Sequence, residues 1–406
     1  MVYESYTLEN GIRIIHLHSN SAVGHCGLII NAGSRDENDH EHGMAHFIEH
    51  AIFKGTKKRK AYHILSRMDD VGGEINAYTT KEETTIHTSF LKNDYERAME
   101  LISDITFNST FPRKEITREK EVIIEEINSY KDDPAELIFD EFEELIFQNQ
   151  PLGKNILGNP KDLRRFTKTD IESFIAKNYH TNEMVLCSIG DISFKKFKKL
   201  ADKYFGHIPA NPRIKNRDQI GSYKPQVKTV KKKTHQTHCI IGNTTYNSHD
   251  DKKVAMTLLD NMLGGPGLNS RLSLLLREKY GYAYHVESNY SPYSDIGVFS
   301  IYFGTDKENF DKCIRLIKKE FELLKTKKLG IVQLKKAKRQ LFGQIAINSE
   351  NNASLMLAMG KSFLLFNKVD DLQKIKEKIE NITVEDIQEI ANEVLDFEKM
   401  SMLVYQ

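Results

Sequence analysis

The feature that most restricts the folds available to this chain is an internal repeat. The apolar run Cys239–Asn243 matches Cys26–Asn31 at an offset of 213 positions, and Ile382–Ile387 matches Phe166–Ile171 at an offset of 216. A nearly constant offset between such distant segments indicates duplication of one domain of about 210 residues. The length of 406 residues fits two such domains, because a single hydrophobic core rarely grows that large. We therefore expect two domains with the same fold.

The boundary between the repeats is predicted in the stretch 209–233. It contains Pro209, Pro212 and Pro225 and the basic run Lys231–Lys233, a composition typical of an extended linker. The chain thus divides into a first domain over residues 1–208 and a second domain over residues 234–406. The lysine run is interpreted as solvated linker, since a formal net charge of +1 gives the chain no overall basic character.

Composition argues against several classes of protein. Hydrophobic residues make up 39% and charged residues 28%, which suits packed cores under a polar surface. No apolar run approaches the roughly 18 residues that cross a bilayer, and Met1–Thr7 has neither a basic nor an apolar leader segment. We expect a cytoplasmic protein with no nucleic-acid or membrane partner. Its four scattered cysteines are predicted to be buried free thiols: Cys26, Cys187, Cys239 and Cys313.

The candidate chemistry lies in the segment His46-Phe47-Ile48-Glu49-His50. Apolar residues at helical spacing around it predict a helix, on which His46 and His50 project from one face. Two imidazoles one turn apart can supply two nitrogen ligands to zinc. Glu49 lies beside them and can take a proton from a water molecule at the metal. The order H-x-x-E-H is the inverzincin signature.

A third ligand has to come from elsewhere in the chain, because catalytic zinc keeps three protein ligands. The acidic helix predicted from Lys114 to about Tyr130 offers Glu119, Glu125 and Glu126. A carboxylate on the apolar side of this helix would be costly to bury without a metal or a cation. Spacing alone does not choose among the three. The corresponding helix of the second repeat has no histidine, so any metal site belongs to the first domain.

Taken together, these segments resemble peptidase family M16, the zinc peptidases that include pitrilysin, insulin-degrading enzyme and mitochondrial processing peptidase. The similarity is greatest to the half-length bacterial branch (M16B type) and covers essentially the whole chain. It rests on six segments: His46–Thr56, Gly72–Ala77, Glu119–Glu126, Pro151–Gly153, Ser270–Leu272 and Arg277–Tyr284. The resemblance implies an α+β fold of two duplicated domains, the LuxS/MPP-like metallohydrolase fold. Each domain would be a mostly antiparallel sheet with helices packed on one side.

The resemblance also implies a role for each residue of the metal site. One Zn²⁺ per chain would be held by His46, His50 and Glu126, although manganese or cobalt suits the same ligands. Glu119 would orient the ligands from behind, and Glu49 would act as the general base.

Two further pairs of residues are assigned by the resemblance. Arg277 and Tyr284, from the domain without zinc, would hold the substrate backbone and the developing oxyanion. Asn76 and Ala77 would lie on the strand edge along which a peptide substrate binds as an added strand.

The implied activity is that of a metalloendopeptidase acting on short or unfolded peptides. A chain of this length holds half of the family's closed shell, so two chains would enclose the chamber. A homodimer is expected, because this sequence has both the zinc motif and the Arg/Tyr pair; an obligate heterodimeric processing peptidase is the alternative. A non-catalytic structural or peptide-binding subunit is a further alternative, although such relatives typically lack part of the metal motif.

Overall fold

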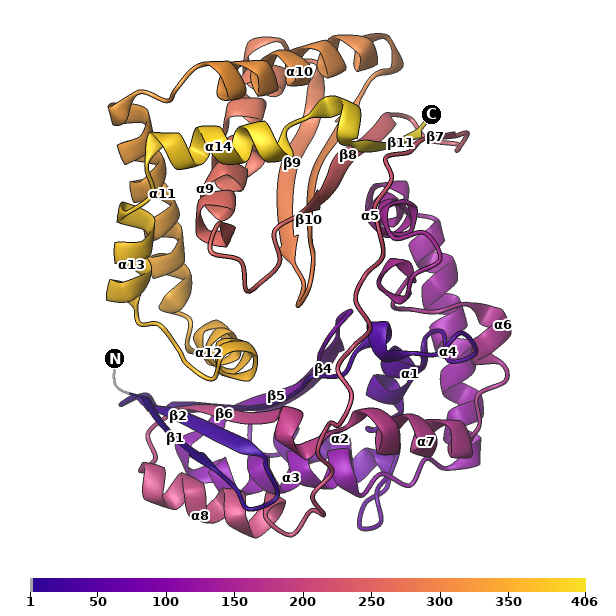
Figure 1. Ribbon diagram of the computed structural model, residues 1–406. Helices are drawn as coiled ribbons and strands as arrows, with labels where there is room; N and C mark the ends of the chain where they lie inside the picture. The colour runs from indigo at the N-terminus through magenta and orange to yellow at the C-terminus, as the bar shows by residue number, and fades with distance from the viewer. Residues whose placement is uncertain (1–2) are drawn as a thin grey trace. The chain divides into compact units, whose positions relative to one another are not determined.

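The first repeat contributes a six-stranded sheet to the computed structural model, which describes residues 3–406 (Figure 1). The strand order is β1-β2-β6-β3-β5-β4. All neighbouring strands are antiparallel except β2 and β6, which are parallel. β4 is therefore an edge strand. The strands are β1 (Tyr3–Thr7), β2 (Arg13–His18), β3 (Val23–Ile30), β4 (Glu74–Thr79), β5 (Thr84–Leu91) and β6 (Met184–Gly190).

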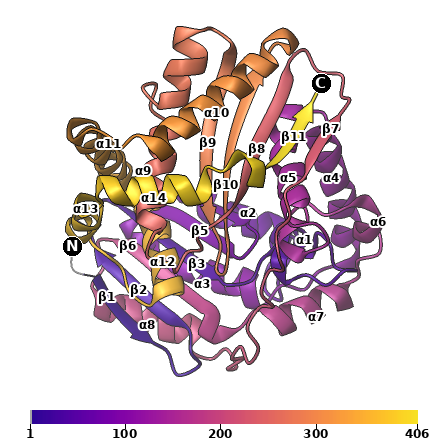
Figure 2. The same ribbon diagram turned by 45° about the horizontal axis from the view of Figure 1, so that its top comes forward.

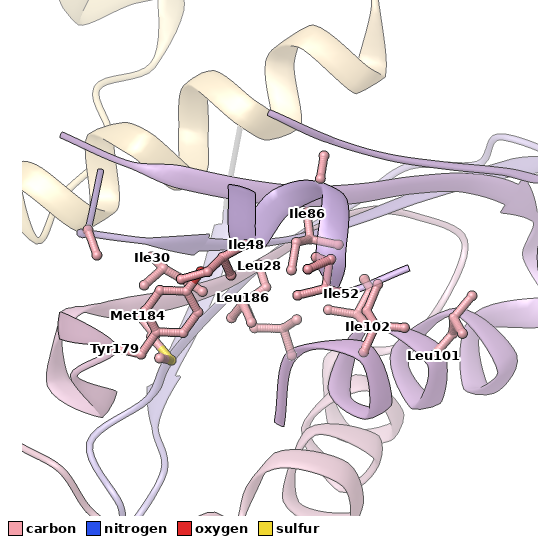
Figure 3. Close-up of a cluster of buried hydrophobic side chains, with 14 of the residues drawn as sticks. Leu28, Ile30, Ile48, Ile52, Ile86, Leu101, Ile102, Tyr179, Met184 and Leu186 are labelled. Carbon is pink, nitrogen blue, oxygen red and sulfur yellow. The ribbon is translucent and has the colours of Figure 1, made fainter. Parts of the chain in front are cut away.

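One face of this sheet is covered by helices of the same repeat. Their apolar side chains and those of the strands form one core, in which Leu28 and Ile86 of the sheet contribute with Ile48 and Ile102 of the helices (Figure 3). Burial of these aliphatic groups is the main force that fixes the helices on the sheet. The helices are α1 (Met44–Ala51), α2 (Ala61–Asp69), α3 (Tyr95–Phe107), α4 (Arg113–Lys131), α6 (Pro160–Leu163), α7 (Lys168–Asn178) and α8 (Phe194–Phe205).

The other face of the first sheet is covered by a helix from the far end of the chain. Met356 and Phe363 of α12 (Asn352–Phe366) pack in a second core with Ile29 and Val185 of the sheet. Because both faces are covered, β6 is buried along its whole length instead of alternating between apolar and polar residues.

The second repeat forms a five-stranded sheet in the order β7-β11-β8-β10-β9, in which only β7 and β11 are parallel. α10 and α14 lie side by side on it (Figures 1 and 2). The strands are β7 (Val227–Val230), β8 (Thr237–Thr245), β9 (Ala283–Pro292), β10 (Gly297–Thr305) and β11 (Ser401–Tyr405). The helices are α9 (Lys253–Gly264), α10 (Phe310–Thr326), α11 (Ile331–Ser349), α13 (Leu372–Glu380) and α14 (Val384–Val394).

The other face of the second sheet is covered by α5 (Pro134–Ile146), a helix of the first repeat. Ile138 and Phe142 of α5 pack against Ile240, Tyr302 and other residues of this sheet. Helices therefore also cover both faces of the second sheet, and its strand β10 has no exposed residue.

The two sheets confirm the predicted duplication. The order β7-β11-β8-β10-β9 repeats β2-β6-β3-β5-β4, with the parallel pair in the same place. The two segments that match at an offset of 216 both form capping boxes, Thr167 with Asp170 and Thr383 with Asp386. The α+β fold of two mostly antiparallel sheets with packed helices is also confirmed.

The helices α5 and α12 occupy equivalent places in the two repeats, and each covers the sheet formed by the other repeat. The two compact units of the structure are therefore interleaved in sequence. The first extends to Asn128 and includes Lys154–Asp218 and Asn348–Val369; the second consists of Ser129–Gly153, Gln219–Ile347 and Asp370–Gln406. The contiguous ranges 1–208 and 234–406 follow the repeats but not these units. Packing on the second face of a sheet is a long-range contact that local sequence does not reveal.

The stretch 209–233 is more ordered than an extended linker. Arg217 is half-buried in the first unit and binds Asp36 with two hydrogen bonds, from Nε to Oδ1 at 2.8 Å and from Nη2 to Oδ2 at 2.7 Å. The same Nη2 donates to the carbonyl of Glu82 at 2.8 Å. Further along, β7 pairs with β11 in the second sheet. Both ends of the stretch are thus held by specific contacts.

The structure bears on two expectations from the sequence, the state of the cysteines and the absence of a membrane-spanning segment. The four cysteines are free and buried, as predicted. Among residues 3–406, no helix combines the length and the apolar character needed to cross a membrane.

Candidate metal centre

Helix α1 presents both histidines of the motif on one side. Its Phe47 and Ile48 are fully buried in the core, which fixes the helix on the sheet; Figure 3 shows Ile48 among the core side chains. His46 and His50, one turn apart, have ring centroids 4.7 Å apart and planes inclined by 68°. As expected for a helix with 3.6 residues per turn, the apolar side chains of this segment lie on one side and the two histidines on another.

Helix α4 brings two carboxylates to these histidines. Ile116, Ile123 and Ile127 of α4 are buried in the same core, so the helix is anchored along one side. Glu126 Oε2 lies 3.6 Å from His50 Nε2, and Glu126 Oε1 lies 3.9 Å from His46 Nε2. The structure therefore places Glu126, rather than the neighbouring Glu125, beside the histidines.

These three side chains fit a metal ion. Their ligand atoms all lie within 4.8 Å of one another. Glu126 is too far from either imidazole for a hydrogen bond, so the atoms converge without bonding to each other. Tetrahedral zinc with bonds of about 2.0–2.2 Å needs ligand atoms roughly 3.3–3.6 Å apart, so small side-chain movements would suffice. Two imidazoles and one carboxylate are a donor set typical of catalytic zinc.

Glu119 lies one layer behind the ligands. Its Oε2 is 3.3 Å from His50 Nδ1, and its Oε1 is 3.0 Å from Lys54 Nζ. Burial raises the pKa of this carboxyl, but hydrogen bonds from His50 and Lys54 outweigh burial and leave the pKa below its ordinary value. An ionised Glu119 accepts a hydrogen bond from the Nδ1–H of His50, which keeps the proton on Nδ1 and leaves the Nε2 lone pair directed at the ligand position.

His46 is held differently. Burial, with a smaller contribution from His50, lowers its pKa to about 4, so the imidazole is neutral at pH 7 and can donate a lone pair. Its Nδ1 is buried and has no hydrogen-bond partner among residues 3–406. Within the described chain, no hydrogen bond to Nδ1 therefore fixes this ring, in contrast to His50, whose Nδ1 contacts Glu119.

Glu49 lies half-buried on the same helix. Burial raises its pKa, Thr79 and His50 lower it, and the nearby charge of Glu126 raises it further; the net shift is upward. A carboxylate with a raised pKa is a stronger base than an exposed glutamate. The structure thus gathers five of the predicted residues in one place: His46, Glu49, His50, Glu119 and Glu126.

Comparison with known proteins identifies the family. The model of the insulinase domain (peptidase family M16) matches residues 13–160, and the model of the peptidase M16 inactive domain matches residues 165–341. An uncharacterized zinc protease of Rickettsia felis is 34% identical over 90% of this chain and 88% of its own length. Another, YmxG of Bacillus subtilis, is 31% identical over 96% of this chain and 95% of its own length.

The chain belongs to peptidase family M16. Membership of this family of zinc proteases supports a metallopeptidase. The fold agrees: a crystal structure of a peptidase M16 inactive domain from Pseudomonas fluorescens matches with a TM-score of 0.92 at 21% identity, covering 100% of this chain and 98% of that one. A protease from Helicobacter pylori matches with a TM-score of 0.90 at 21% identity, covering 100% and 99%.

The N-terminus of α1 in this M16 chain is fixed by Glu37, which sequence reasoning missed. Gly43 precedes the helix with a φ of 95° and offers no capping side chain. Glu37 supplies the cap, because its Oε2 accepts from the N–H of Gly43 and its Oε1 from the N–H of Ala45, both at 2.9 Å. The only sequence signal is an acid a few residues upstream of a helix that lacks a capping residue.

The predicted substrate strand contacts the helix that carries the candidate histidines. Asn76 and Ala77 are on the edge strand β4, which contacts α1. The Ala77 N–H donates a hydrogen bond to Oδ1 of Asn76 at 2.8 Å, so this backbone donor is already bonded to a side chain.

Arg277 and Tyr284 lie in the second unit of the M16 chain. Arg277 is on a π-helical segment (Ser273–Lys279), and its Nε is 3.6 Å from Oε1 of Glu278. Tyr284 is near the start of β9 and is 61% exposed. Neither side chain is buried, and their roles stay predictions.

Proposed function

We propose that this chain is a zinc-dependent metalloendopeptidase that cleaves short or unfolded peptides. The observation that carries the proposal is the convergence of His46, His50 and Glu126 within 4.8 Å in a chain of family M16. The matching of residues 165–341 to an inactive domain agrees with a single metal centre in the first unit.

In the proposed reaction, zinc held by these ligands would polarise the scissile carbonyl and a water molecule. Glu49 accepts a proton from this water as its oxygen bonds to the carbonyl carbon. The carbon–nitrogen bond then breaks, and Glu49 returns the proton to the departing amine. Its raised pKa suits both steps, since the carboxyl has to accept and release one proton near neutral pH.

The peptide would bind along β4 as an added strand. The Ala77 N–H could donate a hydrogen bond to a carbonyl of such a strand. The substrate carbonyl would then replace Oδ1 of Asn76 as the acceptor. In this proposal, Arg277 and Tyr284 hold the substrate backbone and the oxyanion, as in the family this chain resembles.

The test is hydrolysis of a quenched-fluorescent peptide by the purified protein, with and without a chelator, beside Glu49→Gln. We expect chelator-sensitive cleavage that falls at least a hundredfold in Glu49→Gln while bound zinc is retained. Glu121→Gln, an exposed acid on α4, is the control and should keep wild-type activity. Zinc binding without cleavage by the purified chain would favour an obligate heterodimer. The absence of both zinc binding and cleavage would refute the proposal that the chain is an enzyme.

The assembly proposed is a homodimer in which two chains enclose the peptide. Light scattering on the active protein checks this directly, because a homodimer has twice the chain mass of 46.8 kDa. A monomer that gains activity only after addition of a second protein would favour the heterodimer.

A further inference from the structure

The second unit contains a groove lined by apolar and cationic side chains, none of which has a role in the proposed peptidase reaction. It lies between α11 and α13 and encloses about 430 Å³, within the range of small-molecule sites. Leu334 and Ile379 form its buried floor, and Phe342 lines it half-buried. Ile331 lines the same groove with 82% of its surface exposed. The floor therefore offers apolar contact to a ligand.

The groove is also lined by four cations and only one acid. Lys335 and Arg339 are one turn apart on α11, and neither has an acidic partner within ion-pair distance in the described chain. Like charges at this spacing repel each other. Without a partner, this pair favours a bound anion.

The other two cations of the groove are only partly compensated. Lys338 donates to the carbonyl of Glu380 at 2.8 Å, and burial lowers its pKa. Lys376 Nζ lies 3.8 Å from Oε1 of Glu380 and 5.8 Å from the ring centre of Phe342. Glu380 is thus the single acid among the lining residues, and the groove has an excess of positive charge.

We propose that this groove binds a single-chain amphipathic carboxylate of the fatty-acid type. The acyl chain lies on Leu334, Phe342 and Ile379, and the carboxylate meets Lys335 and Arg339, whose planar guanidinium can hold both oxygens. An extended peptide fits less well, because the groove is walled by two helices whose backbone groups are mostly bonded within each helix. Peptide amides would lose water there without gaining partners, whereas an acyl chain has no such groups.

The test is calorimetric titration of the full chain with dodecanoate below its critical micelle concentration. Dodecanol probes the chain without the charge, butyrate the charge without the chain, and an acetylated leucine-rich peptide the alternative occupant. The variant Lys335→Gln/Arg339→Gln removes the proposed carboxylate contacts. Its matched control is Lys336→Gln/Lys374→Gln, which removes two exposed lysines of the same helices that do not line the groove.

We expect dodecanoate to bind the wild-type chain at least tenfold more tightly than dodecanol, and butyrate not to bind measurably. The Lys335/Arg339 variant should lose about tenfold in dodecanoate affinity, and the control variant less than twofold. Unchanged thermal unfolding of both variants shows that the fold is retained. Equal affinity for dodecanol, equal loss in the two variants, preference for the peptide, or no binding of dodecanoate would each overturn the proposal.

Discussion

Glu119 and His50 are in direct contact: Oε2 of Glu119 lies 3.3 Å from Nδ1 of His50, on the side of the ring opposite Glu126. One imidazole thus lies between two carboxylates of α4 that are seven residues apart. The inner carboxylate is buried and the outer one is 44% exposed. In the proposed metal site, the outer carboxylate would bind the metal and the inner one would hold the ligand His50.

Replacing the inner carboxylate, Glu119, should lower the affinity for the metal without abolishing binding. Glu119→Gln removes the negative charge that favours a proton on Nδ1 of His50, and zinc affinity is expected to fall about 10- to 100-fold. Competition with a chromophoric chelator measures the affinity. Glu121→Gln on the exposed side of α4 should keep the wild-type value, and an unchanged affinity in Glu119→Gln would contradict the orienting role.

Replacing the outer carboxylate should remove the metal. Glu126→Gln eliminates the anionic ligand, so the protein purified after zinc loading should hold less than a tenth of the wild-type zinc. Glu125→Gln changes the adjacent residue of the same helix, which is exposed and is not among the three grouped ligands, and should keep full occupancy. Zinc loss in Glu125→Gln with retention in Glu126→Gln, measured by atomic emission, would reverse the assignment.

The cap on α1 is expected to contribute to stability. Glu37→Ala leaves the N–H groups of Gly43 and Ala45 buried without an acceptor, which should lower the free energy of unfolding by about 2 kcal/mol. Glu37→Gln keeps one carbonyl acceptor and should lose less. Urea unfolding of the metal-free proteins measures both, and equal stability of Glu37→Ala and wild type would argue against the cap.

Acid should destabilise the first unit through His16. Its Nε2 donates to the carbonyl of Ile192 at 2.9 Å, Nδ1 is buried without a partner among the described residues, and burial lowers the pKa to about 4. The unfolded chain protonates near the ordinary value of about 6.5, so His16 stabilises the fold above that pH and the contribution is lost as pH falls from 6.5 to 4. The loss amounts to roughly 3 kcal/mol at most.

The His16 contribution is measured as a difference in slope. Between pH 7 and 4, the free energy of unfolding should fall less steeply in His16→Leu than in the wild type. The exposed His207 of the same unit is the control, and His207→Gln should keep the wild-type slope. Parallel curves for His16→Leu and wild type would show that another group causes the acid sensitivity.

The sequence by itself determined the local features of this protein. An i, i+4 spacing places His46 and His50 on one face of any helix, so the pair of nitrogen ligands follows from helix geometry alone. The matching segments at offsets of 213 and 216 gave the duplication, and each occurs at the same place in its repeat. Each of these features lies within a short run of consecutive residues, so it can be recognised without knowing which distant segments come into contact.

Only the tertiary structure decided which groups from distant segments meet. Glu119, Glu125 and Glu126 were equivalent by spacing, and the packing of Ile123 and Ile127 in the core set the rotation of α4 that turns Glu126 toward the histidines. The same holds for Glu37 at the start of α1 and for the exchange of α5 and α12 between the sheets. The physical reason is that burial of apolar surface is non-directional: a sequence shows that a face must be covered, but not which segment covers it.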